Sequence, residues 1–195
     1  MAAVPVSRFL RVYRLRHHVR MVPPGSERLV LRRLTTADVD LLVDLDSDPE
    51  VLRYISRSAP SYQEVAALVA ALVSDYSRHP RWGRWAALDS ATGDFAGWFA
   101  LRVDGPGVLD LGYRLRRSFW GRGLASEMSR ALVAYAFEDP SIDRVVARTM
   151  AVNHRSRRVM ENAGLTYRRT FHPHFDDPLP GTDLGEVEYE IRPRP

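Results

Sequence analysis

The sequence predicts a single α+β domain built on a sheet of about seven strands, and three observations lead to this prediction. The chain has 195 residues, enough to bury a core without disulfides or structural metals. Hydrophobic residues make up 45% of it and charged residues 27%, a balance typical of a globular protein and not of a disordered chain. Alternating strand patterns and helical periodicities follow one another without an internal repeat or a linker.

Composition excludes several kinds of chemistry. The chain has no cysteine, so thiolate nucleophiles, cysteine zinc sites and disulfides are excluded, and a cytoplasmic location is expected. All 28 basic residues are arginine, which excludes Schiff-base and P-loop lysines. The longest apolar run, 65–73, is far shorter than the roughly 20 residues of a transmembrane helix, so no membrane partner is expected. The net charge is only +4 and most arginines stand among acids, which argues against nucleic acid as a partner.

The first 24 residues differ from the rest of the chain. They are rich in arginine and contain no acid, because the first acidic residue is Glu27. Such a segment is typical of a flexible tail, of an extension upstream of a start at Met21, of a targeting peptide, or of an arm that binds RNA. The break at Pro23-Pro24-Gly25 predicts a boundary, so the folded domain is expected over 25–195.

Local patterns predict the individual elements. Apolar alternation bounded by turn residues predicts strands over 28–34, 85–89, 95–103, 108–115, 144–150, 165–171 and 186–191. Caps and i, i+4 spacing predict a first helix that Thr35 or Thr36 caps and that carries Val39, Leu42, Val43 and Leu45, and further helices over 61–76, 124–137 and 153–162. Ser61 and Glu64 form a capping box at the start of the second helix. Asp46-Ser47-Asp48-Pro49 is expected to end the first helix, and Gly164 the last.

The segment from Leu111 to Glu127 carries the clearest functional signal. A strand leads into the glycine-rich turn Trp120-Gly121-Arg122-Gly123-Leu124-Ala125, and a helix begins at once. This order aims backbone N–H groups and the positive end of a helix dipole at one point, which suits a phosphate or pyrophosphate. Gly121 and Gly123 lack a Cβ, so an anion can approach the backbone closely. The absence of lysine excludes a Walker A loop, and Ser126 stands where the dinucleotide fingerprint needs a third glycine.

Two motifs resemble the GNAT superfamily of acetyl-CoA-dependent N-acetyltransferases. Trp120 to Ala125 is similar to the family's (Gln/Arg)-x-x-Gly-x-(Gly/Ala) pyrophosphate loop. Asn153 to Leu165 is similar to the Asn-x-x-Ser segment of the branch that acetylates the N-termini of ribosomal proteins. The resemblance extends over about 27–191. It implies the GNAT fold, a mixed, mostly antiparallel sheet of about seven strands flanked by about four helices. It also implies an acyltransferase with acetyl-CoA as cosubstrate and no metal.

The resemblance further implies where acetyl-CoA binds. The cosubstrate would lie in a split between the strands that end at Leu115 and near Met150. The pantetheine amides would pair with the exposed strand edge, and the pyrophosphate would bind the N–H groups of the turn. The cofactor-binding residues expected on this basis are Tyr113, Arg114, Leu115, Trp120, Gly121, Arg122, Gly123, Leu124, Ala125, Asn153 and Ser156.

In this family the acceptor amine attacks the thioester directly, so a base and an acid assist the reaction. Asp110 stands where relatives often carry glutamate and is the candidate base; alternatively it is an exposed acid on a strand edge. Met160 stands where many relatives carry a tyrosine acid, so Ser156 becomes the candidate acid; alternatively it satisfies backbone groups in the first turn of a helix. Asn153 is a helix cap, a cofactor contact, or both.

The acceptor is expected to be a primary amine, either a protein N-terminus or a small molecule. Acids in 186–190 alternate with core-forming residues and are candidates for lining its pocket. Longer acyl donors and a homodimer stay open. Two other classes of function also stay open: a catalytically weak acyl-CoA-binding module, suggested by Met160, and an RNA-associated protein that uses the arginine-rich N-terminus.

Overall fold

The computed structural model describes residue 23 and residues 25–193, so the prediction of a basic extension over 1–24 lies almost entirely outside the described residues. Within them, one sheet has the strand order β1-β2-β3-β4-β5-β7-β6. The strands are β1 Leu29–Arg33, β2 Gly83–Asp89, β3 Phe95–Gly105, β4 Val108–Leu115, β5 Arg144–Met150, β6 Thr166–Phe171 and β7 Glu186–Ile191. Only β4 and β5 pair in parallel; the other neighbours are antiparallel. The predicted mixed, mostly antiparallel sheet is confirmed.

The α-helices found in the described chain are α1 Val39–Ser47, α2 Pro49–Leu52, α3 Tyr62–Asp75, α4 Leu124–Phe137 and α5 His154–Asn162. The capping box is confirmed, because the Ser61 Oγ accepts from the Glu64 N–H and the Glu64 carboxylate accepts from the Ser61 N–H. About four helices were expected, and the additional one is the short helix α2. Pro49 begins α2 instead of only ending α1: Asp48 caps the new helix, and proline suits its first position. None of these helices is long and apolar enough to cross a membrane.

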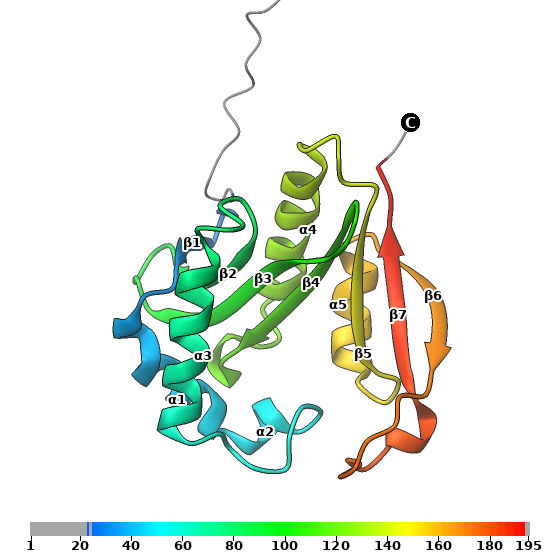
Figure 1. Ribbon diagram of the computed structural model, residues 1–195, viewed down its shortest axis with the longest axis horizontal. Coiled ribbons are helices and arrows are strands. Elements are labelled where there is room, and N and C mark those ends of the chain that lie inside the picture. Colours follow the sequence, from blue (N-terminus) through cyan, green and yellow to red (C-terminus); the bar gives the residue numbers. More distant parts are fainter. Residues whose placement is uncertain (1–22, 24, 194–195) are drawn as a thin grey trace, which may run out of the picture.

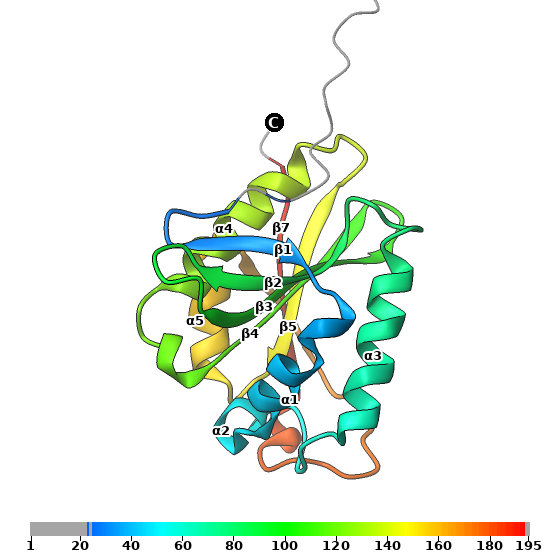
Figure 2. The same cartoon turned by 90° about the vertical axis from the view of Figure 1, so that its left-hand side faces the viewer.

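The helices lie on both faces of the sheet (Figures 1 and 2). On one face, α4 packs Met128 and Leu132 against Phe99 of β3, and all three are fully buried. On the other face, Val65 and Val69 of α3 pack over the first strands. Strand residues therefore alternate between two apolar cores, as the period of two along a strand requires.

The strands β4 and β5 pair at only three positions and then separate. The paired residues are Val108↔Arg144, Leu109↔Val145 and Asp110↔Val146. Beyond Asp110, β4 keeps its pairing with β3 as far as Leu115, but its other edge pairs with no strand in the described part of the chain. Figure 1 shows the two strands together at the top and apart below. The sheet therefore contains the split that the resemblance implies.

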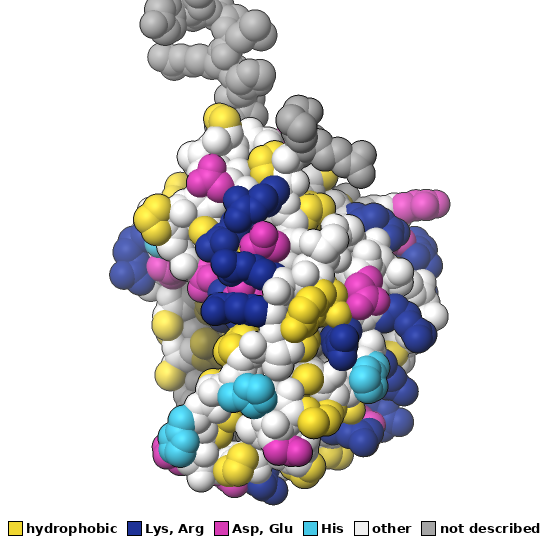
Figure 3. Space-filling model, turned by 90° about the vertical axis from the view of Figure 1, so that its right-hand side faces the viewer, with side chains coloured by type: hydrophobic (Ala, Val, Ile, Leu, Met, Phe, Trp, Pro, Cys, Tyr) yellow, Lys and Arg dark blue, Asp and Glu magenta, His cyan; other side chains and the backbone are white. Residues whose placement is uncertain are grey.

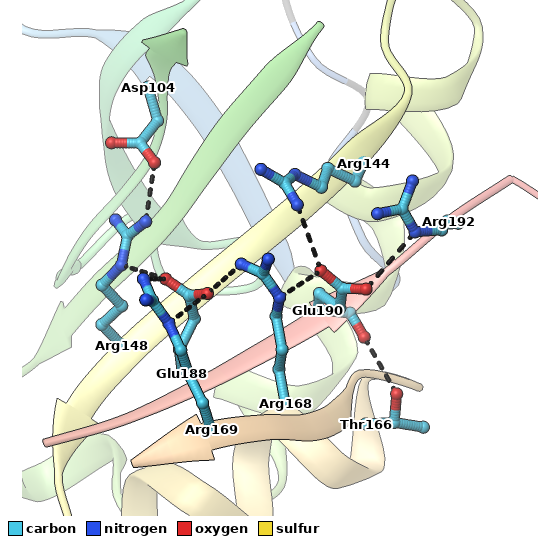
Figure 4. Close-up of polar contacts among 9 residues, drawn as sticks. All are labelled: Asp104, Arg144, Arg148, Thr166, Arg168, Arg169, Glu188, Glu190 and Arg192. Carbon is cyan, nitrogen blue, oxygen red and sulfur yellow. Dashed lines mark hydrogen bonds and ion pairs between the residues drawn. The ribbon is translucent and has the colours of Figure 1, made fainter. Parts of the chain in front are cut away.

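A charged network lies on one face of the sheet, at the strands β5, β6 and β7 (Figures 3 and 4). Glu188 of β7 is 0% exposed and accepts from Arg148 at 2.7 Å, Arg168 at 2.5 Å and Arg169 at 3.2 Å. Arg148 also pairs with Asp104 at 2.7 Å. Burial raises the pKa of Glu188, but the hydrogen bonds from the three arginines outweigh it and lower the pKa to about 2. These ion pairs join β5, β6 and β7 on a face that Figure 1 shows without a covering helix.

Candidate active site

The turn between β4 and α4 has the geometry of an anion-binding loop. Gly121 and Gly123 adopt left-handed backbone conformations, with φ of 72° and 77°, which residues with a Cβ rarely adopt. The backbone bonds of α4 begin where the Glu127 N–H donates to the Gly123 carbonyl oxygen over 3.0 Å. The N–H groups of Leu124 and Ala125 therefore precede the helical ladder, at the positive end of the helix dipole. A Cβ built on Gly121 meets no atom within 4 Å, so the loop is open to a ligand.

Arg28, just before β1, holds this loop in place. Its guanidinium donates to the Arg122 carbonyl oxygen over 2.9 Å and to the Glu127 carboxylate over 2.5 Å. The side chain of Arg122 forms an ion pair with Asp89 at 3.5 Å, so it contributes its backbone to the loop. No pattern in the sequence indicates the contact between Arg28 and Glu127, because the two residues are 99 positions apart.

Tyr113, Arg114 and Leu115 occupy the stretch of β4 beyond its last pairing with β5. Each pairs with β3 on one side, so the backbone edge on the other side lines the split. The Trp120 Nε1 donates to the Leu115 carbonyl oxygen over 2.8 Å, which folds the loop back onto the end of β4. The Arg114 side chain instead reaches Asp46 of α1 at 2.5 Å, so only its backbone belongs to the edge.

Asn153 and Ser156 lie at the start of α5, across the split from β4. The Asn153 Oδ1 accepts from the Ser156 N–H over 3.2 Å, and its Nδ2 donates to the Thr149 Oγ1 over 3.0 Å, so Asn153 is the helix cap. The Ser156 Oγ takes no part in this cap. It lies 2.8 Å from the Tyr113 hydroxyl, and that hydroxyl also donates to the Ser156 carbonyl oxygen over 3.1 Å. Burial raises the pKa of Tyr113, so its phenol stays protonated. The contact brings two predicted site residues together across the split.

Asp110 is the last β4 residue that pairs with β5, so it stands where the split begins. It is 9% exposed and lies in a central strand, which overturns the alternative of an exposed acid on a strand edge. Its carboxylate forms ion pairs with Arg102 of β3 and, at 3.6 Å, with Arg148 of β5. Because side chains alternate along β4, Asp110 and Tyr113 lie on opposite faces of the sheet.

The face that carries Asp110 also borders a pocket of about 260 Å³ between the helices α1 to α3 and the end of β4. Its charged lining residues are Asp46, Glu64 and Arg114. Its apolar lining residues are Leu52, Ile55, Ala59 and Pro60. The pocket therefore combines an apolar wall with a few charged groups, as small-molecule sites commonly do.

Residues of the strand 186–191 alternate between the apolar core and a charged face, as the sequence pattern predicts. Val187 and Tyr189 are 2% and 1% exposed and belong to the main core, whereas Glu188 is occupied by three arginines. Burial raises the pKa of Glu186, and its carboxylate has no hydrogen bond or ion pair with another described residue. That these acids line the acceptor pocket stays a prediction.

Comparison with known proteins assigns this fold to a family. A family model for the acetyltransferase (GNAT) domain matches residues 28–166. The FsC-acetyl coenzyme A-N(2)-transacetylase of Aspergillus fumigatus is 34% identical over 176 residues, which are 85% of this chain and 74% of that protein. The chain therefore belongs to the GNAT acetyltransferase family, and it is an acyltransferase enzyme.

Two solved structures share the fold. RimL, a ribosomal L7/L12 alpha-N-protein acetyltransferase in complex with coenzyme A, superposes with a TM-score of 0.74 at 21% identity and covers 88% of this chain and 97% of its own. Spermidine N-acetyltransferase from Vibrio cholerae, in complex with CoA and spermine, gives 0.72 at 16% identity and covers 85% and 95%. One is named for a protein N-terminus and the other for spermidine, so the shared fold does not select an acceptor.

Proposed function

We propose that the chain transfers an acetyl group from acetyl-CoA to a primary amine by direct attack within a ternary complex. The split beside an open glycine loop carries this proposal, because it offers the two surfaces that a CoA thioester needs. The free edge at Tyr113 to Leu115 suits the pantetheine amides. The N–H groups of Gly121 to Ala125 suit the pyrophosphate. The acceptor is a protein N-terminus or a small-molecule amine.

Two side chains suit the proton transfers of this reaction. Attack forms a C–N bond and breaks the C–S bond, the amine loses a proton and the thiolate gains one. Asp110 would accept the amine proton, directly or through a water molecule. Ser156, which contacts Tyr113 on the opposite face, would donate to the sulfur. The base and the acid then lie on different sides of the reacting carbon. The base is beside the attacking amine and the acid is beside the leaving sulfur.

Binding of acetyl-CoA is the first test. A ligand at about 100 times its dissociation constant stabilises a fold by about 2.7 kcal/mol, which raises Tm by roughly 5–10 °C for a domain of this size. We expect a shift of that order with acetyl-CoA and none with ATP or NAD. No shift at millimolar acetyl-CoA would refute the proposal, because the glycine loop would then be only a helix start.

Turnover tests the catalytic roles. Because the chain has no cysteine, every thiol released in the assay comes from CoA. Ser156→Ala keeps the Asn153 cap, which uses the Ser156 backbone N–H, and removes only the hydroxyl. We expect kcat to fall about 100-fold, within the usual range for general acid–base catalysis. Ser141→Ala, in the loop before β5, is the control and should turn over normally. A Ser156→Ala enzyme with the kcat of the control would remove Ser156 from the mechanism.

A further inference from the structure

Arg84 of β2 lies against the sheet, and its positive charge forms no ion pair with a carboxylate among the described residues. Its guanidinium carbon lies 4.0 Å from the centre of the Trp98 ring. The Arg84 Nε is shut off from solvent and unpaired. Its two terminal nitrogens bond to no residue that the structure describes. Donors of this kind are ready for an anion that comes from outside the chain.

Arg84 differs from other arginines whose Nε is buried and unpaired. Arg81 and Arg116 also have a buried, unpaired Nε, but Arg81 pairs with Glu138 at 3.4 Å and Arg116 with Asp44 at 2.6 Å. Burial, together with the charges of Arg114 and Arg102, lowers the pKa of Arg84 to about 10. At neutral pH the group is still charged, and a buried charge without a partner is unfavourable.

Arg114 approaches the same indole from β4. Its guanidinium carbon lies 5.3 Å from the centre of the Trp98 ring, and its Nη1 donates to Asp46. Asp46 therefore pairs with Arg114, whereas Arg84 has no carboxylate partner among the described residues. Arg114 also lines the pocket of about 260 Å³. Arg84 does not line this pocket, but the two planar guanidinium groups lie at one indole, and such a pair can act as a fork that binds a carboxylate through paired N–H donors.

The spacing along β4 connects this fork to the reaction. Arg114, Gly112 and Asp110 point to the same face, at intervals of about 7 Å. Gly112 has no side chain, and the Trp98 ring lies 3.5 Å from the position that its Cβ would take, so the indole covers the strand between the two charged residues. A small acceptor whose acid group meets the arginines therefore lies against this indole, with its amine toward the split and Asp110.

We propose that the acceptor amine also carries a carboxylate, which Arg84 and Arg114 bind, so that the acceptor is an amino acid or a close derivative of one. This inference rests on the proposed acetyltransferase function. The pocket volume of about 260 Å³ supports it, because typical small-molecule sites begin at about 300 Å³ and a small acceptor is required.

Matched acceptors test the inference with the full-length chain. Each free amino acid is compared with its own amide, with spermidine added as an acceptor that has no acid group, and CoA release is followed. We expect kcat/KM for the acids to exceed that for the amides by about 10- to 100-fold, the value of a charge-assisted hydrogen bond. Arg84→Gln should remove this preference and leave turnover of the amides within about 3-fold. Arg78→Gln changes an arginine that is 73% exposed and should preserve the preference.

Two further measurements decide between the possible outcomes. Arg84→Lys keeps the charge but not the planar fork, so it should restore part of the preference. The acetyl-CoA thermal shift reports separately on folding and cosubstrate binding, and it should be the same in wild type and in every Arg84 variant. If the shift is normal and amides or spermidine react as well as acids, this inference is wrong and the proposed function stands. If no amine reacts, the proposed function fails and the inference fails with it.

Discussion

Replacing Gly121 by alanine tests the pyrophosphate loop against a control within the same chain. Gly121 has φ 72°, and Gly93, in the turn between β2 and β3, has φ 77°. A Cβ built on either glycine meets no atom within 4 Å. Gly121→Ala and Gly93→Ala should therefore cost the same backbone strain, about 1–2 kcal/mol, and lower Tm by about 2–8 °C.

Acetyl-CoA binding should separate the two variants. In Gly121→Ala the new methyl group occupies the open space through which a phosphate approaches the loop. Weakening even one charge-assisted hydrogen bond, worth about 1.5–3 kcal/mol, lowers affinity by about 10- to 100-fold. Gly93→Ala lies outside the loop and should bind as tightly as wild type. Isothermal titration calorimetry at fixed salt measures both affinities, and circular dichroism melts measure both stabilities.

The control makes the result interpretable. If Gly121→Ala and Gly93→Ala both bind acetyl-CoA as tightly as wild type and lose the same amount of Tm, the assignment of the phosphate to this loop is refuted. A similar loss of affinity in both variants would also refute it, because the effect would then follow from destabilisation and not from the position of the methyl group.

Two further predictions concern stability. Because the folded-state pKa of Glu188, about 2, is below its ordinary 4.5, its ion pairs stabilise the fold fully above about pH 4.5 and are lost as the pH falls toward 2. Melts across this window should show Tm falling more steeply in wild type than in Glu188→Gln; parallel curves would contradict the pairing. In Gly97→Ala the Cβ would lie 2.1 Å from the Arg114 carbonyl oxygen, so we expect loss of the folded state by circular dichroism, and a wild-type melt would disprove this.

Local patterns predicted most elements closely. The predicted bounds of β4, α4 and β5 agree with the structure, and the capping box begins α3. Each rests on residues within one turn or one strand, where alternation, caps and backbone preference act. Pro49 was the exception: it can end one helix or begin another, and the choice depends on whether Val51 and Leu52 find a core to pack into.

The sequence by itself determined the secondary structure, the glycine loop and the family, because these depend on residues close together in the chain. Only the tertiary structure decided which side chains meet. It joined Arg28 to Glu127 and Ser156 to Tyr113, residues 99 and 43 positions apart. It also left Arg84 without a counter-ion among the described residues. The physical reason is that ion pairs and burial follow from the strand order and from which face each residue occupies, and a one-dimensional pattern carries neither.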